Sequence, residues 1–178
     1  MNGSIQKGEY VVYGKVGVCR VVDRQQMSFG AGGGGEYYVL APESDPHSSV
    51  YVPCGNRTLM ERLRPLMTQQ EIEDMLEAVP QQTVEWIDDR TRRQDCFRSM
   101  MADGDRRQLL RLIRCLSGKK RERMAEGKTL SSADESLMRE CIRLVDEEFS
   151  LALRMPREQV GAYIRAHLPG TAEPAPAV

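Results

Sequence analysis

The chain has 178 residues, which is enough for one ordinary domain or two small ones. Hydrophobic residues make up 40% of it without a long apolar run, which excludes a transmembrane helix, and the N-terminus has no signal-peptide pattern. Five scattered cysteines form no C-x-x-C motif. The sequence therefore predicts neither a zinc cage nor a disulfide framework, and it favours reduced thiols in the cytoplasm.

Charge is distributed unevenly along the chain. The formal net charge is -1, but between Arg90 and Lys128 thirteen basic residues stand against five acidic ones, a local net charge of +8. The rest of the chain carries -9. Such asymmetry is typical of a surface that faces a polyanion. A solvated helix face with its counter-charges elsewhere in the fold explains it at least as well.

The first third of the chain predicts β-strands. Segments rich in valine and tyrosine occur at residues 10–13, 16–22, 37–40 and 50–52, with glycines between them. The glycine run 31–35 is expected to form a flexible hairpin tip. Four or five short strands over about 65 residues predict a small, strongly bent barrel of the SH3-like or Tudor-like type.

The segment 50–52 is the predicted edge strand, since Pro53 blocks further pairing where it ends. An exposed edge is a liability unless another strand pairs with it. We therefore expect a partner strand to dock at this edge by β-augmentation.

After Pro65 the pattern changes to helices. Thr68 and Glu71 form a capping box, and Pro80 ends the helix that follows. The expected helices cover residues 69–79, 83–101, 106–116, 131–153 and 157–168, with a short basic helix after Ser117-Gly118. The fold class is α+β: a small SH3/Tudor-like β-barrel followed by an all-α helical bundle. The domains are residues 1–67 and 68–168, with a disordered tail at 169–178.

The third expected helix has two different faces. One face carries apolar residues: Leu109, Leu112, Ile113 and Leu116. The opposite face carries Arg107, Arg111 and Arg114, and Lys119 and Lys120 follow. These basic side chains are candidate phosphate contacts, and an ordinary solvated face is the alternative.

The single tryptophan opens the most basic stretch of the chain. On a continuous helix, one face would carry Trp86, Arg90, Arg93 and Phe97. Aromatic wedges flanked by cations are one way in which proteins hold unstacked nucleic acid. The alternative is that Trp86 is a core residue joining two domains, because tryptophan is usually largely buried.

Catalysis and metal binding have little support. Cys54 and His47 are close in sequence and could pair as a nucleophile and its base, but Cys54 follows a proline and no orienting acid is evident. Two histidines without ligand spacing offer no metal site. We expect no enzymatic activity, no catalytic residue, no metal and no cofactor.

Several segments occur in an order known from one family. They are KGEYVVYGKVGVCRVVD, EYYVLAP, SVYVP and LRPLM, followed by ADGDRRQLLRLIRCL and KTLSSADESLMRECIRLVDEEFSLAL. This set resembles the CarD-like transcription regulators, whose N-terminal RNA-polymerase-interacting domain is shared with transcription-repair coupling factor. The resemblance covers about residues 5 to 168.

The resemblance implies a non-enzymatic regulator of transcription. The barrel would bind the lobe of the bacterial RNA polymerase β subunit through an edge strand, here Val50, Tyr51 and Val52. The helices would contact promoter DNA near the upstream edge of the transcription bubble, without sequence specificity, where a tryptophan wedge slows bubble collapse. The expected DNA contacts are Trp86, Arg90, Arg93, Arg107, Arg111, Arg114, Lys119 and Lys120. We expect the free protein to be a monomer. In the cell, we expect it to be cytoplasmic and associated with the nucleoid.

Two positions depart from the family pattern. The family register of the wedge falls on Arg90, one turn after Trp86, and Tyr51 stands where members often carry arginine. A second hypothesis is a protein-interaction adaptor, in which the helices bind protein and Trp86 is an internal anchor. The sequence does not distinguish an activator from a repressor.

Overall fold

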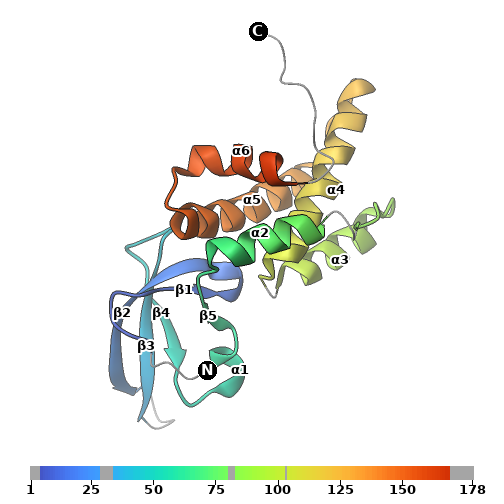
Figure 1. Ribbon diagram of the computed structural model, residues 1–178. Coiled ribbons are helices and arrows are strands. Elements are labelled where there is room, and N and C mark those ends of the chain that lie inside the picture. Colours follow the sequence, from blue (N-terminus) through green and yellow to red (C-terminus); the bar gives the residue numbers. More distant parts are fainter. Residues whose placement is uncertain (1–4, 29–33, 80–82, 103, 169–178) are drawn as a thin grey trace. The chain divides into compact units, whose positions relative to one another are not determined.

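The computed structural model describes residues 5–28, 34–79, 83–102 and 104–168. The chain divides into two compact units, Met1–Leu66 and Met67–Val178 (Figure 1). The expectations for Pro80, for residues 31–33 of the hairpin tip and for the tail fall on residues outside the described ones. Gly34 and Gly35, also expected in the flexible tip, instead lie in a strand and pair with Ser28 and Met27.

The N-terminal unit is an antiparallel sheet. Its strands are β1 (Tyr10–Tyr13), β2 (Gly17–Ser28), β3 (Gly34–Pro42), β4 (Val50–Pro53) and β5 (Leu63–Pro65), with a short 3-10 turn η1 (Gly14–Val16) and a short helix α1 (Arg57–Met60). The strand order is β4-β3-β2-β1-β5. Because β4 and β5 lie at opposite edges and do not pair with each other, the sheet is open. The predicted closed barrel is therefore not observed in the described residues, whereas the α+β class is confirmed.

The core of this unit follows period-two alternation on β4, whereas on β3 the residues from Tyr38 to Pro42 are buried in succession. On β4, Val52 is fully buried while Tyr51 is 43% exposed. On β3, Tyr38 is buried and its neighbour Tyr37 is half-buried, as alternation predicts for this pair. Val52 pairs with Tyr38 across the ladder, so both contribute to the same apolar cluster.

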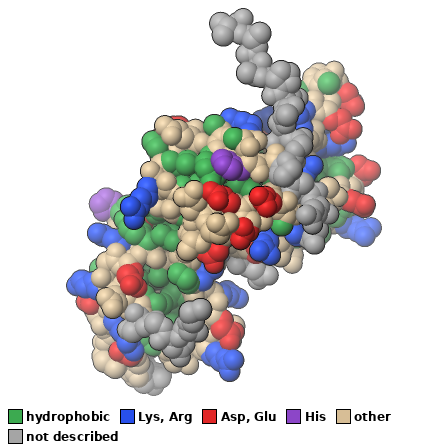
Figure 2. Space-filling model, viewed as in Figure 1, with side chains coloured by type: hydrophobic (Ala, Val, Ile, Leu, Met, Phe, Trp, Pro, Cys, Tyr) green, Lys and Arg blue, Asp and Glu red, His purple; other side chains and the backbone are tan. Residues whose placement is uncertain are grey.

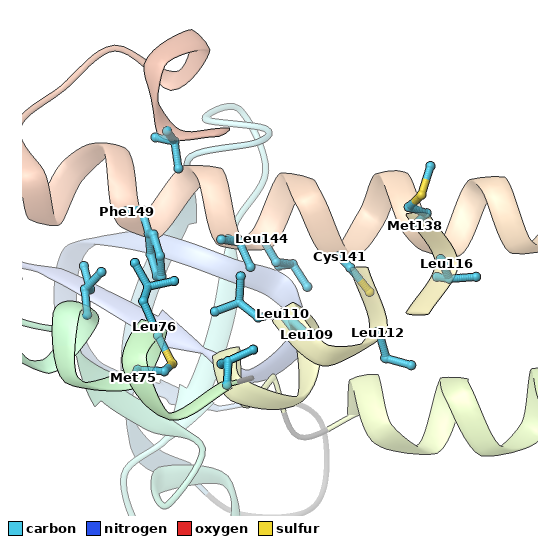
Figure 3. Packing of buried hydrophobic residues seen from close by; sticks show 14 of the residues in the cluster. Met75, Leu76, Leu109, Leu110, Leu112, Leu116, Met138, Cys141, Leu144 and Phe149 are labelled. Atoms are coloured by element: carbon cyan, nitrogen blue, oxygen red, sulfur yellow. The ribbon is translucent and has the colours of Figure 1, made fainter. Parts of the chain in front are cut away.

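The C-terminal unit is entirely helical. Its helices are α2 (Gln69–Ala78), α3 (Arg90–Ala102), α4 (Arg106–Ala125), α5 (Ser132–Leu153) and α6 (Arg157–His167). The predicted capping box of Thr68 and Glu71 is confirmed at the start of α2. Figure 3 shows Leu109 and Leu110 of α4 near Leu144 of α5, and Phe149 of α5 near Leu76 of α2, within one core cluster.

The prediction of one helix over 83–101 is wrong at its start. Residues 83–89 are not helical, and α3 begins at Arg90. Asp89 caps it, because its side chain accepts a hydrogen bond from the Arg92 N–H at 2.8 Å and its carbonyl accepts one from the Arg93 N–H at 3.0 Å. Trp86 therefore precedes the helix, and the expected stripe of Trp86 with Arg90 does not form.

The prediction that α4 stops before Ser117-Gly118 is also wrong. The helix continues to Ala125, and Figure 1 shows its last turns projecting from the helical unit. Gly127 ends it in a left-handed conformation, with φ at 70°. The N–H groups of Gly127 and Lys128 donate to the carbonyls of Met124 and Arg123, which is the Schellman pattern. The basic segment after Gly118 is thus part of α4.

A buried ion pair lies inside the helical unit. Arg106 Nε is 2.7 Å from Glu148 Oε2, and the two side chains are 1% and 0% exposed. Arg106 also donates to the Gly104 carbonyl at 2.8 Å, while Glu148 Oε1 accepts from the Met67 N–H at 3.0 Å. The pair therefore joins the start of α4, the C-terminal half of α5 and the entry to α2.

Breaking this pair should destabilise the protein strongly. Removing one partner leaves an uncompensated buried charge, so Arg106→Ala is expected to lower the free energy of unfolding by about 3–5 kcal/mol in urea denaturation. The control is Lys128→Ala, because the Lys128–Glu126 pair is largely exposed and should contribute at most about 1 kcal/mol. An equally small loss in the free energy of unfolding for both variants would show that the buried pair stabilises the fold no more than an exposed pair does.

Candidate nucleic-acid interface and partner-binding edge

Trp86 lies in the non-helical segment ahead of α3 and is half-buried. The Arg93 guanidinium carbon is 4.1 Å from the centre of the indole ring, and Lys119 Nζ is 5.5 Å from it. Phe97 meets the indole edge-to-face, with ring centres 6.4 Å apart. Trp86 therefore touches both cations and the helical core, although through a geometry that differs from the predicted stripe.

Arg93 is buried, contrary to the expectation that it faces a DNA groove. Its Nε and Nη2 donate to the two carboxylate oxygens of Asp134 at 3.2 and 3.0 Å. Its Nη1 donates to the carbonyls of Ile87 and Asp88 at 2.6 and 3.1 Å. All three nitrogens of the guanidinium thus have partners within the fold, which leaves Arg93 unavailable to a phosphate in this conformation.

Asp134 is held at the start of α5. The Ser131 hydroxyl donates to Asp134 Oδ2 at 2.7 Å and accepts from the Asp134 N–H at 3.2 Å, which makes Ser131 the N-cap. Burial raises the pKa of Asp134, but hydrogen bonds from Arg93 and Ser131 and the positive charges of Arg93 and Arg90 outweigh it. The pKa therefore lies below the ordinary aspartate value, and the carboxylate stays charged at neutral pH.

The three arginines predicted on the outer face of α4 form a row. Arg107, Arg111 and Arg114 follow at helical spacing, and the structure leaves Arg107 and Arg114 exposed and Arg111 half-buried. Within the described part of the chain, no ion pair joins any of the three to a carboxylate. Arg111 Nε is buried without a hydrogen-bond partner among the same residues. The row is thus an uncompensated positive surface.

The remaining basic residues of this region differ in their partners. Lys119 Nζ is 2.7 Å from Glu122, and Arg90 is exposed on the first turn of α3. Three basic residues meet carboxylates from outside the window 90–128: Arg93 with Asp134, Arg106 with Glu148 and Lys120 with Glu135. The local excess of positive charge is therefore partly balanced by the fold and partly left at the surface.

Negative charge in the helical unit gathers elsewhere. Figure 2 shows Asp and Glu side chains clustered over α2, a helix whose sequence contains no lysine or arginine. Glu71, Asp74 and Glu77 are exposed there. Because like charges repel, a polyanion would avoid α2 and favour the arginine row of α4.

The predicted polymerase contacts lie on an edge strand. Among the described strands, β4 pairs only with β3. The Cys54 N–H donates to the Glu36 carbonyl at 2.8 Å, so the antiparallel ladder directs the backbones of Val50 and Val52 toward β3 and that of Tyr51 away from it. The side chain of Val52 belongs to the core, which leaves Tyr51 as the main exposed side chain of the strand.

Other kinds of site receive no support from the described residues. They contain no group of three or more His, Cys, Asp or Glu placed to hold a metal ion. None of the helices described is long and apolar enough to cross a membrane. A groove of about 260 Å³ lies between α3 and α5, with Phe97, Met101 and Leu137 among its lining residues.

A small open sheet with an accessible edge strand is a fold that can pair with a strand of a partner. Residues 5–66 match the family model of the CarD-like/TRCF RID domain, which covers nearly all of this unit. Residues 5–66 are therefore a CarD-like/TRCF RID domain, as their sequence motifs predict. A comparison with curated proteins gives no match. The match ends at residue 66 and does not extend into the helical unit.

Two aspartates of α5 should affect stability with opposite signs. The lowered pKa of Asp134 means that its ion pair stabilises the fold above the ordinary aspartate pKa, so Asp134→Asn should be destabilising at pH 7. That loss should shrink as the pH falls below about 4. Urea unfolding between pH 3 and pH 7, followed by Trp86 fluorescence, measures it.

Asp146 provides the matched control. Burial raises its pKa to about 6, so its charged form opposes folding at pH 7. Asp146→Asn should therefore be stabilising at pH 7, and the gain should disappear as the pH falls toward about 4. If both substitutions shift stability in the same direction at pH 7, the electrostatic assignment of one of them is incorrect.

Proposed function

We propose that this protein is a bacterial transcription regulator that binds RNA polymerase through its N-terminal sheet and promoter DNA through its helical unit. The sheet would dock on the lobe of the β subunit, and the helices would contact DNA near the upstream edge of the transcription bubble. The observation that carries the proposal is the family match over residues 5–66, in a unit whose β4 lies at the sheet edge. Such a protein would work in the cytoplasm, on the nucleoid.

The polymerase contact is proposed to form by β-augmentation on β4. Main-chain pairing would supply affinity, and side chains that alternate along the strand would supply specificity. Val50, Tyr51 and Val52 would form this strand, with the exposed ring of Tyr51 reaching the partner and Val52 supporting the strand from the core.

The DNA contact is proposed to centre on α4. An uncompensated row of arginines suits the phosphate backbone, which every sequence shares, so binding would be non-specific in sequence. The proposed phosphate contacts are Arg90, Arg107, Arg111, Arg114, Lys119 and Lys120, with Trp86 as the side chain that meets the unstacked base step. Arg93 is withdrawn from this set because its guanidinium is buried against Asp134.

The proposed consequence is a longer-lived open complex. An aromatic side chain against an unstacked step at the upstream fork would slow bubble collapse, and the phosphate contacts would hold it there. The same effect would help promoters that open poorly and would hinder escape at others.

A protein-interaction adaptor is the second candidate. The packing of Trp86 on Phe97 favours it, because a tryptophan used as an internal anchor makes such contacts. In that case the helical unit would bind protein, and the arginine row would contact an acidic partner surface.

Truncating Tyr51 tests the polymerase half of the proposal. Tyr51→Ala is expected to weaken binding to the isolated β-subunit lobe by about 1–2 kcal/mol, since aromatic side chains at interface centres contribute most. Tyr10→Ala is the matched control, because Tyr10 is 37% exposed but lies on β1, which is not an edge strand. Failure of the unmodified protein to bind the lobe would refute this half outright.

Removing the arginine row tests the DNA half. Each lost phosphate contact should lower the slope of log affinity against log salt by about one, so the triple change of Arg107, Arg111 and Arg114 to alanine should lower it by about three. Two forked duplexes of unrelated sequence should lose affinity equally. Arg139→Ala, an exposed arginine of α5, should leave the slope unchanged. An unchanged slope in the triple variant would favour the adaptor.

A further inference from the structure

We infer that the buried Arg93–Asp134 pair is a positioning device for Trp86, which holds the indole ready for the unstacked DNA step. The inference rests on the DNA contact proposed above for Trp86. It assigns to Arg93 and Asp134 an action through the tryptophan and no contact with DNA of their own.

The first support is the number of constraints that one guanidinium imposes. Arg93 stacks on the indole at 4.1 Å and donates to the carbonyls of Ile87 and Asp88, the two residues that follow Trp86. The same side chain therefore contacts both the ring and the backbone of the segment that carries it. Since this segment belongs to no helix or strand, these contacts replace the restraint that regular structure would provide.

The second support is that the guanidinium is itself fixed. Asp134 accepts from it with both carboxylate oxygens, and Ser131 binds Asp134 at the capped start of α5. A planar guanidinium in a bidentate ion pair has a defined orientation as well as a defined position. Helix α5 thus determines, through Asp134 and Arg93, where the plane of the indole lies.

The third support is the desolvation free energy that the buried Arg93–Asp134 pair costs. Placing an ion pair in an apolar core opposes folding through desolvation, and apolar residues of similar volume commonly stabilise a fold equally well. Lysine at position 93 would keep the charge, but as a compact point charge it would lose the planar stacking and the paired hydrogen bonds. An arginine at this place is therefore better explained by orientation than by stability.

A positioned indole would bind with less loss of freedom. An aromatic group already in its bound orientation avoids the entropy cost of ordering on association, and that cost corresponds to about two- to tenfold in affinity or lifetime. Phe97, in edge contact with the ring, restricts it from another direction. Trp86 would thus meet the fork as a preformed wedge.

A double-mutant cycle tests the inference. Four proteins are compared in full-length form with RNA polymerase and a promoter: unmodified, Trp86→Ala, Arg93→Lys and the double variant. The lifetime of the open complex is measured for each. Arg93→Lys is expected to shorten it about two- to tenfold when Trp86 is present and to have no effect in the Trp86→Ala background. Arg98→Lys, an exposed change on the same helix, should be neutral in both backgrounds.

A second readout separates positioning from general damage. In the free protein, acrylamide should quench Trp86 fluorescence more strongly after Arg93→Lys, while far-UV circular dichroism stays unchanged. Asp134→Asn leaves Arg93 in place without its charged partner and should increase quenching in the same way. This variant replaces Arg93→Lys in the experiment if Arg93→Lys does not fold.

The outcomes that overturn the inference differ from those that overturn the function. If Arg93→Lys shortens the lifetime equally in both backgrounds, the pair has only a structural role and the inference is wrong while the wedge stands. If Trp86→Ala leaves the lifetime unchanged, the proposed wedge is wrong and the inference with it.

Discussion

The helical unit depends on an ion pair between Arg93 of α3 and Asp134 of α5. These residues are 41 positions apart in sequence, and their pairing joins the capped start of α5 to the segment that carries Trp86. A guanidinium that is 5% exposed requires this carboxylate, because an unpaired buried charge is too costly to retain. The position of the tryptophan is therefore a property of the tertiary fold and not of its local sequence.

The same principle divides the basic residues into two groups. Arg93 and Arg106 enter the core because α5 provides Asp134 and Glu148, whereas Arg107, Arg111 and Arg114 stay on the outer face of α4. The net charge of +8 between Arg90 and Lys128 includes buried and exposed arginines equally. Among the described residues, the first group has counter-charges from α5 and the arginines on the outer face of α4 have none, so the surface available to a polyanion is smaller than the charge of the window indicates.

Local signals predict much of this fold. The strand Tyr10–Tyr13 follows from its valine and tyrosine content, the start of α2 from the capping box at Thr68, and the helix from Ser132 to Leu153 from periodicity. The RID family follows from motifs in order. The predicted helix ends are wrong where a capping residue lies within a pattern that also fits a continuous helix, or where two glycines could each end the helix. Asp89 caps α3 within a pattern that otherwise continues the helix, and Gly127, not Gly118, takes the left-handed turn that ends α4. Sheet closure and the burial of Arg93 depend on partners distant in sequence, which no local pattern specifies. The position of Glu148, a carboxylate on the apolar stripe of α5, is consistent with a buried cation, and the structure pairs it with Arg106.

The most direct measurement is a structure of the protein with RNA polymerase and a promoter in the open state. In that complex we expect β4 to pair with a strand of the β-subunit lobe and the Trp86 ring to contact the base step at the upstream fork. We also expect Arg93 to remain bound to Asp134 beneath the ring. A complex in which Trp86 lies away from the DNA, or in which β4 keeps β3 as its only neighbour, would contradict these expectations.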